Sequence, residues 1–214
     1  MSFMFSPFPY DDLNVVNHVN VSLDVTNKIL SNNELIKKEL VSELFNKSNK
    51  ILVIDGYPTC NFDVIVKMFS NVKLINMRDI YKDEKEIYNM LKSYLPEDRI
   101  MDPVWLYGKL FIDGLKKLMD EEKLLNLIES LKNTSEKIIV YGHGSLIKEI
   151  RELADIKIYM DVSPKEAAIR AKKGLYINIG DKKARPFKEL MRRNYYVDFE
   201  NETLLRKELV QQNA

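Results

Sequence analysis

The chain has 214 residues, of which 45% are hydrophobic and 30% charged, so its composition is that of a globular protein and excludes a disordered or fibrous one. The single cysteine, Cys60, and the two histidines, His18 and His143, show no metal-ligand spacing, which argues against a zinc site in this chain. No apolar run reaches the roughly 18 residues of a membrane span, and the amino terminus lacks the basic region of a signal peptide. We therefore expect a cytoplasmic protein that does not bind membranes.

Short, β-branched apolar runs at 50–56, 72–77, 137–142 and 156–162 predict four strands. Apolar residues at helical spacing predict helices over 33–45, 61–69, 84–91, 110–131, 145–153 and 164–173. Strands that are apolar on both faces and alternate with helices are typical of a parallel sheet covered on both sides. The sequence thus predicts an α/β fold with three layers, α/β/α, and a mainly parallel sheet.

The predicted domain organisation has three parts. Residues 1–49 form an amino-terminal arm and a helix that packs on the core, and residues 50–199 form the α/β domain. Residues 200–214 form a helical tail that could lead into a further domain. No Gly- or Pro-rich linker separates these parts.

The charge is uneven along the chain. Residues 165–193 contain ten Lys and Arg against three acidic residues, although the whole chain has a net charge of only +1. Few aromatic residues are interleaved there, so we expect a nucleotide or another small phosphorylated molecule as partner, and no nucleic acid. Four arginines are the candidate phosphate ligands; the alternative is a solvated basic face. They are Arg170, Arg185, Arg192 and Arg193.

The loop after the first predicted strand is the natural place for a phosphate-binding loop. The pattern G-x-x-x-x-G-K-[S/T], started at Gly56, would end at Asn61, Phe62 and Asp63, so its second glycine, lysine and hydroxyl are missing. Gly56, Thr59 and Asn61 are the candidates for a weakened anion site. Asp55 could hold a magnesium ion through water. The alternative for this loop is a plain strand-to-helix turn.

The loop after the third predicted strand reads YGHGSL. Gly142, Gly144 and Ser145, with Ser145 as the helix N-cap, are further candidates for holding an anion. A tight turn that needs glycine explains the same composition. His143 could act as an acid or base near neutral pH, but the sequence shows no partner for it. Asp102, in MDPVWL, is a candidate hydroxyl acceptor or, alternatively, a turn residue before proline.

The segments KIIVYGHGSLI, ADIKIYMDVSPKEAAIRAKKG and RPFKELMRRNYYVDF, in this order, resemble the second half of uridine-kinase-like P-loop phosphotransferases. LINMRDIYK resembles the same family's catalytic turn, although Arg78 stands where that family has its general base and Asp79 is offset by one position. The resemblance implies a P-loop nucleoside triphosphate hydrolase fold of the kinase type, a catalytic Asp79 and a basic lid. The missing lysine and hydroxyl of the phosphate loop predict that binding of a nucleotide with Mg²⁺ is weak. The Gly, Pro and charged residues of IGDKKARP, with few apolar anchors, predict that the lid over 174–193 is mobile.

A second resemblance includes the amino-terminal arm. FSPFPYDDLNVVN, IDGYP, MDPVWLYGKLF and RRNYYVDF are together similar to the kinase-like half of long bacterial proteins that end in a cupin-type class I mannose-6-phosphate isomerase. It implies a role in carbohydrate metabolism and an isomerase domain as partner, with the zinc ligands in that other half. Phe3, Phe5, Phe8 and Tyr10 would dock on the isomerase or fold back on the sheet.

Three functions remain open from the sequence. The leading hypothesis is a kinase-like module that binds a nucleotide or sugar phosphate and has a degenerate phosphate loop, because phosphoryl transfer depends on positioning and charge neutralisation. The second is an active, ATP-dependent small-molecule phosphotransferase with a non-standard loop. The third is a structural module that forms homo-oligomers.

Overall fold

The computed structural model describes residues 22–46, 48–97, 102 and 106–212. The chain divides into two compact units, residues 1–38 and 39–214. In the first unit, helix α1 (Leu23–Thr26) begins after Ser22, whose side chain accepts a hydrogen bond from the Val25 N–H. Helix α2 (Asn33–Asn46) begins in this unit and ends in the next. The aromatic residues at positions 3–10, which carry the docking prediction, lie outside the described residues.

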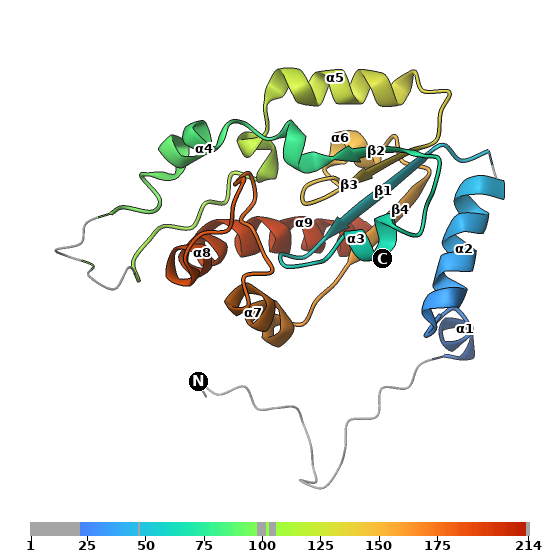
Figure 1. Cartoon of the computed structure of the whole chain (residues 1–214), viewed down its shortest axis with the longest axis horizontal. Helices are drawn as coiled ribbons and strands as arrows, with labels where there is room; N and C mark the ends of the chain where they lie inside the picture. The colour runs from blue at the N-terminus through green and yellow to red at the C-terminus, as the bar shows by residue number, and fades with distance from the viewer. Residues whose placement is uncertain (1–21, 47, 98–101, 103–105, 213–214) are drawn as a thin grey trace, which may run out of the picture. The chain divides into compact units, whose positions relative to one another are not determined.

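The second unit is built on a parallel sheet of four strands (Figure 1). The strands are β1 (Ile51–Gly56), β2 (Lys73–Asn76), β3 (Ile138–Tyr141) and β4 (Ile156–Met160), in the order β2-β3-β1-β4. All four predicted strands are confirmed, with slightly shorter ends. Strand β1 is internal, and all six of its residues are buried.

Helices pack against both faces of the sheet, so the predicted α/β architecture is confirmed. Ile51 and Val53 of β1 face one layer, which includes apolar residues of α4, α5, α6 and α9, whereas Leu52 and Ile54 face α3. The helices of this unit after α2 are α3 (Asp63–Val66), α4 (Glu84–Leu91), α5 (Glu121–Lys132), α6 (Lys148–Arg151), α7 (Pro164–Lys172), α8 (Phe187–Arg193) and α9 (Phe199–Gln212).

The long helix predicted over 110–131 is wrong in its first half. Only η2 (Leu115–Leu118), a 3₁₀ turn, and α5 are helical there. Gly114 has φ +86° and its N–H donates to the side chain of Asn201, so it cannot continue a helix. Asp120 then caps α5 by accepting from the Lys123 N–H at 3.0 Å. The turn at Gly114 and the N-cap at Asp120 therefore interrupt the helix that the apolar spacing predicts.

Helices α8 and α9 are joined without a break by a π-helical turn, η3 (Asn194–Asp198). Leu205 of α9 is 8% exposed and belongs to the core on the α5 side of the sheet. Much of the segment expected to be a separate tail is thus part of a helix that packs on the sheet. The remaining 3₁₀ turn, η1 (Met77–Ile80), follows β2 directly.

Candidate functional site

A cavity of about 260 Å³ lies at the carboxyl edge of the sheet. From β1 the chain crosses to the outer strand β2, and from β3 it crosses in the opposite direction to β4, so β1 and β3 flank the point where the topology switches. In open parallel sheets ligands bind at this point. The cavity is lined by residues that follow β1, β2 and β3 and by the segment after α7: 60–63, Asn76, Arg78, Tyr81, 141–143, 175–177 and 179–180.

The side chain of Asp55, at the end of β1, is fully buried beneath this edge. It accepts hydrogen bonds from three backbone N–H groups, those of Gly56 at 2.7 Å, Gly144 at 3.2 Å and Leu146 at 2.7 Å. Burial, followed by the nearby Glu202, raises the pKa of this carboxyl group well above its usual range. The backbone donors of Gly56 and Gly144, predicted to hold an anion, are therefore directed at a carboxyl group of the protein itself.

His143 and Glu202 lie next to Asp55. The His143 Nδ1 atom is 2.9 Å from the Gly56 carbonyl oxygen and 3.2 Å from Glu202 Oε1. Burial lowers the pKa of His143 and raises that of Glu202 well above its usual range, the latter with a contribution from Asp198. The imidazole packs edge-on against the rings of Phe62 and Tyr176. His143 therefore has the carboxyl partners that the sequence alone did not reveal.

A second buried polar network lies beside this cluster. Asp198 accepts from Tyr176 Oη at 3.0 Å and from Asn178 Nδ2 at 2.7 Å. Arg193, 4% exposed, donates to Asp181 Oδ1 at 3.2 Å and to the Ile179 carbonyl, and lies 3.7 Å from Asp198. These bonds attach residues 176–181 to α8 and η3. The segment expected to be a mobile lid is therefore anchored by buried polar contacts.

The four arginines predicted to bind phosphate are engaged with the protein. Arg170 pairs with Glu166 and donates to the Thr59 carbonyl, and Arg185 pairs with Asp181. Arg192 donates to the carbonyl oxygens of Tyr107 and Pro96.

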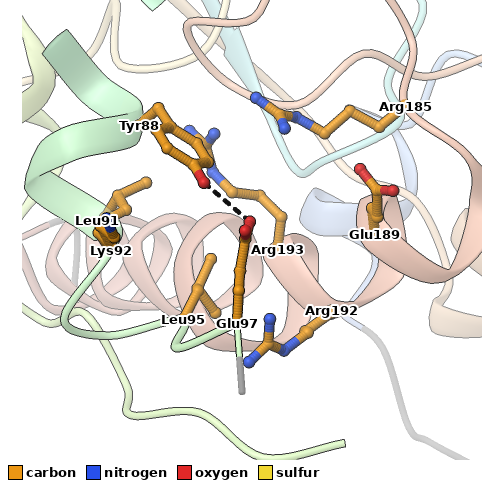
Figure 2. A pocket seen from close by; sticks show the side chains of 9 residues that line it. All are labelled: Tyr88, Leu91, Lys92, Leu95, Glu97, Arg185, Glu189, Arg192 and Arg193. Atoms are coloured by element: carbon orange, nitrogen blue, oxygen red, sulfur yellow. Dashed lines mark hydrogen bonds between the residues drawn. The ribbon is translucent and has the colours of Figure 1, made fainter. Parts of the chain in front are cut away.

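Three of these arginines, Arg185, Arg192 and Arg193, line a second cavity, which shares no lining residue with the first (Figure 2). Residues of α4 line the same cavity, among them Tyr88. The Tyr88 hydroxyl donates to Glu97 Oε1 at 2.9 Å, and Glu97 lines the cavity as well. The volume of this cavity is only about 50 Å³, which is too small for an organic phosphate.

The other predicted residues divide between the cavity edge and the interior. Asn61 and Gly142 line the cavity. Thr59 is buried with φ +78°, and its hydroxyl has no hydrogen-bond partner in the described part of the chain. Ser145 donates to the Ile54 carbonyl at 2.8 Å and does not cap α6, whose N-cap is Ile147.

The two predicted catalytic carboxylates do not line the cavity. Asp79 is exposed in η1, on the turn that follows β2. Asp102 is buried and accepts at 2.7 Å from the N–H groups of both Leu106 and Tyr107, which matches its alternative role as a turn residue.

Arg78 is the functional candidate that the sequence reasoning missed. It lines the cavity, is exposed, and its guanidinium has no ion pair or hydrogen bond among the residues described. Its backbone N–H donates to Asn76 Oδ1 at 2.9 Å, which fixes the turn at the end of β2. The departure from the kinase pattern at this position was itself the signal, because it puts a cation where a carboxylate was expected.

Cys60 provides a test of the environment at the cavity wall. Burial raises the pKa of its thiol to about 12, and Sγ lies 3.3 Å from the Met160 carbonyl oxygen. Alkylation by iodoacetamide at pH 8 should therefore be slower by about 1000-fold in the native chain than in guanidinium, where the thiol has its ordinary pKa. Mass spectrometry over time measures both rates. Equal rates would contradict this description of the wall.

The fold and the cavity together define an α/β protein with a cavity at the switch point of a parallel sheet. The chain belongs to the family described as Domain of unknown function (DUF8485), whose model matches residues 34–213. No curated protein matches the sequence. No helix among the residues described is long and apolar enough to cross a membrane.

Two solved structures are similar to this chain. One is a proposed fructose transport system kinase from Silicibacter sp. TM1040, with a TM-score of 0.52 and 11% identity over 83% of this chain and 95% of that one. This likeness shows a shared α/β fold. The other is RIF2 of Saccharomyces cerevisiae, with a TM-score of 0.30 and 11% identity over 75% of this chain and 69% of that one, which does not indicate a common fold.

Proposed function

We propose that this protein is a kinase-like module that binds a small phosphorylated molecule in the cavity at the carboxyl edge of the sheet. The observation that carries the proposal is Arg78, an exposed cation at the wall of that cavity that forms no ion pair with any described residue. A guanidinium offers two parallel donors to a phosphate group. Asn61 and Asn76, on the same wall, offer amide groups that can bind the rest of the ligand.

The size of the cavity supports a sugar phosphate or a nucleoside monophosphate over a complete triphosphate. Its volume of about 260 Å³ lies below the range of roughly 300–1,000 Å³ typical of drug-sized ligands. The similar structure from Silicibacter, a proposed fructose transport system kinase, makes a hexose phosphate the first probe to use.

Binding without phosphoryl transfer is the expected mode. Gly56 and Gly144 donate to Asp55, so these N–H groups are not free to hold the phosphates of ATP. In a working phosphate-binding loop this position has a positive potential that attracts phosphate. In this chain the carboxyl group of Asp55 occupies it. These contacts support a degenerate phosphate loop. Micromolar, strongly Mg²⁺-dependent binding of ATP with turnover would replace this proposal with an active phosphotransferase.

The test is calorimetry with a hexose 6-phosphate and a nucleoside monophosphate, each compared with its unphosphorylated form. Arg78→Ala should weaken binding of the phosphorylated form by about 10- to 100-fold, the effect of losing a charge-assisted hydrogen bond, and leave the unphosphorylated form unchanged. Arg206→Ala is the matched control, because Arg206 is a half-exposed arginine paired with Asp161 outside the cavity. Equal effects of both variants, or no binding of any phosphorylated probe, would overturn the proposal.

Association with a mannose-6-phosphate isomerase domain stays a prediction from the sequence resemblance. It is tested by co-purification of this chain with a cupin-type class I mannose-6-phosphate isomerase domain, before and after deletion of residues 1–10. Capture that depends on those residues would support docking through the aromatic arm. Failure of the full chain to co-purify would exclude the association and leave the binding proposal intact.

A further inference from the structure

Three ligand-type side chains converge from separate elements of the second unit. Asp55 comes from the end of β1, His143 from the loop after β3, and Glu202 from the first part of α9. One nitrogen or carboxylate oxygen from each lies within 4.8 Å of the other two. Donor atoms bound to one metal ion at about 2.0–2.2 Å are separated by distances within this limit.

Glu202 is the group that requires an explanation. Its side chain is completely buried, and the donors that approach its oxygens among the residues described are His143 Nδ1, 3.2 Å from Oε1, and the Gly144 N–H. Neither contact has the geometry of a formed hydrogen bond. No Lys or Arg of the described residues forms an ion pair with Glu202 or with Asp55. The buried Arg193 pairs with Asp181 and lies near Asp198. Buried polar groups are almost always satisfied, so a buried carboxylate without a cation or a well-formed hydrogen bond is a candidate ligand for a bound ion.

A second unsatisfied atom belongs to the neighbouring strand. Tyr159 of β4 is the register partner of Asp55 in β1, and its hydroxyl is buried with no hydrogen-bond partner among residues 22–46, 48–97, 102 and 106–212. Because register partners in adjacent strands project to the same face of a sheet, this hydroxyl lies on the Asp55 side. In the part of the chain that the structure describes, a polar atom beside the cluster thus has no partner.

We infer that Asp55, His143 and Glu202 form a binding site for a divalent transition-metal ion. The His143 Nδ1 and Glu202 Oε1 atoms are 3.2 Å apart, the separation expected of two adjacent ligands at about 2.1–2.2 Å from one ion. Two carboxylates neutralise a dication, which removes the cost of burying them without a counter-ion. Binding through Nδ1 requires the tautomer protonated at Nε2, and it leaves the Gly56 carbonyl oxygen beside the ion as a further donor.

The ligand set selects the kind of metal. An imidazole nitrogen with two carboxylates suits Mn²⁺, Fe²⁺ or Zn²⁺, whereas Mg²⁺ and Ca²⁺ prefer oxygen ligands only. This differs from the magnesium role expected for Asp55 and from the expectation that the chain holds no zinc. The site does not depend on which molecule occupies the cavity above it.

The experiment uses the full chain, freed of any affinity tag, stripped with chelator and titrated with Mn²⁺ and with Zn²⁺. Bound Mn²⁺ is measured by electron paramagnetic resonance and bound Zn²⁺ by equilibrium dialysis. The wild-type chain should bind one equivalent. Glu202→Gln, which keeps the shape and removes the charge, should weaken binding by about 100-fold or more, since even loss of an outer-shell partner costs 10- to 100-fold.

Glu200→Gln is the matched control, because Glu200 is a partly exposed carboxylate in the same helix and outside the cluster. It should bind like the wild type. Circular dichroism of the metal-free variants verifies their folding, and His143→Gln gives an independent second variant that should also lose the ion. Absence of stoichiometric binding by the wild type at millimolar metal would overturn the inference. Equal affinity of Glu202→Gln and Glu200→Gln would overturn it as well.

Discussion

Replacing Arg193 with Met should destabilise the protein by about 3–5 kcal/mol, the typical cost of removing one partner of a buried ion pair. Arg193 is 4% exposed and lies between two carboxylates, Asp181 and Asp198, that are both fully buried. Met has a similar length and fills the space. Asp181 keeps its pair with Arg185, so the loss comes from Asp198, which is left without a cation, and from the free Ile179 carbonyl. Urea unfolding followed by circular dichroism measures the change.

Removing the charge of Asp198 tests whether an unpaired carboxylate causes the loss of stability in Arg193→Met. Asp198→Asn in the Arg193→Met background should recover part of the loss, because the amide still accepts from Tyr176 and needs no counter-charge. Arg206→Ala should cost less than about 1 kcal/mol, since its pair with Asp161 is half exposed. A loss of similar size in Arg206→Ala and Arg193→Met would contradict the assigned role of the buried network.

Gly144→Ala should destabilise by about 2–4 kcal/mol. Gly144 has φ +77°, a conformation that costs other residues about 1–2 kcal/mol. An added Cβ would also lie 2.7 Å from Met119 Cε and 2.9 Å from Tyr81 Oη, so the packed side chains must shift. The same Tyr81 hydroxyl donates to the His143 carbonyl at 2.9 Å, so the displacement should reach the site. Thermal and urea unfolding give the magnitude.

Gly174→Ala separates the backbone cost of a positive φ from the cost of crowding the added Cβ. Gly174 has φ +70°, but nothing lies within 4 Å of its would-be Cβ, so this variant measures the backbone cost alone, about 1 kcal/mol. The difference between the two variants is then the cost of crowding around Gly144. If both variants lose the same stability, the close packing at Gly144 is not as described.

Local patterns in the sequence are sufficient to predict the sheet and the edge of the sheet at which the site lies. β-branched apolar runs fixed all four strands, and their carboxyl ends located Asp55, Asn61 and Gly142 at one edge. The same local reasoning failed for 110–131, because Gly114 and Asp120 take their conformations from contacts with Asn201 and Lys123 that periodicity does not contain.

The chemistry of the site depended on contacts between distant segments. His143 had no partner in sequence because Glu202 reaches it from a helix that seemed to be a tail. The basic residues of 165–193 suggested a solvent-facing phosphate clamp, whereas burial turned Arg192 and Arg193 toward backbone carbonyls and carboxylates of the same chain. Charge patterns show how many cations a segment has, and only packing shows what they bind.

The π-helical turn η3 has a consequence for how the metal-ligand cluster could arise or disappear. Each residue of an α-helix advances the chain by about 100° around the axis, so one residue more or less in 194–198 would rotate α9 against the sheet and move Glu202 away from Asp55 and His143. Insertion or deletion of a single codon could thus add or remove the third side chain while every residue around the cavity stays unchanged. In homologous genes, the length of this turn should be a better marker for the complete cluster than the identity of Asp55 itself.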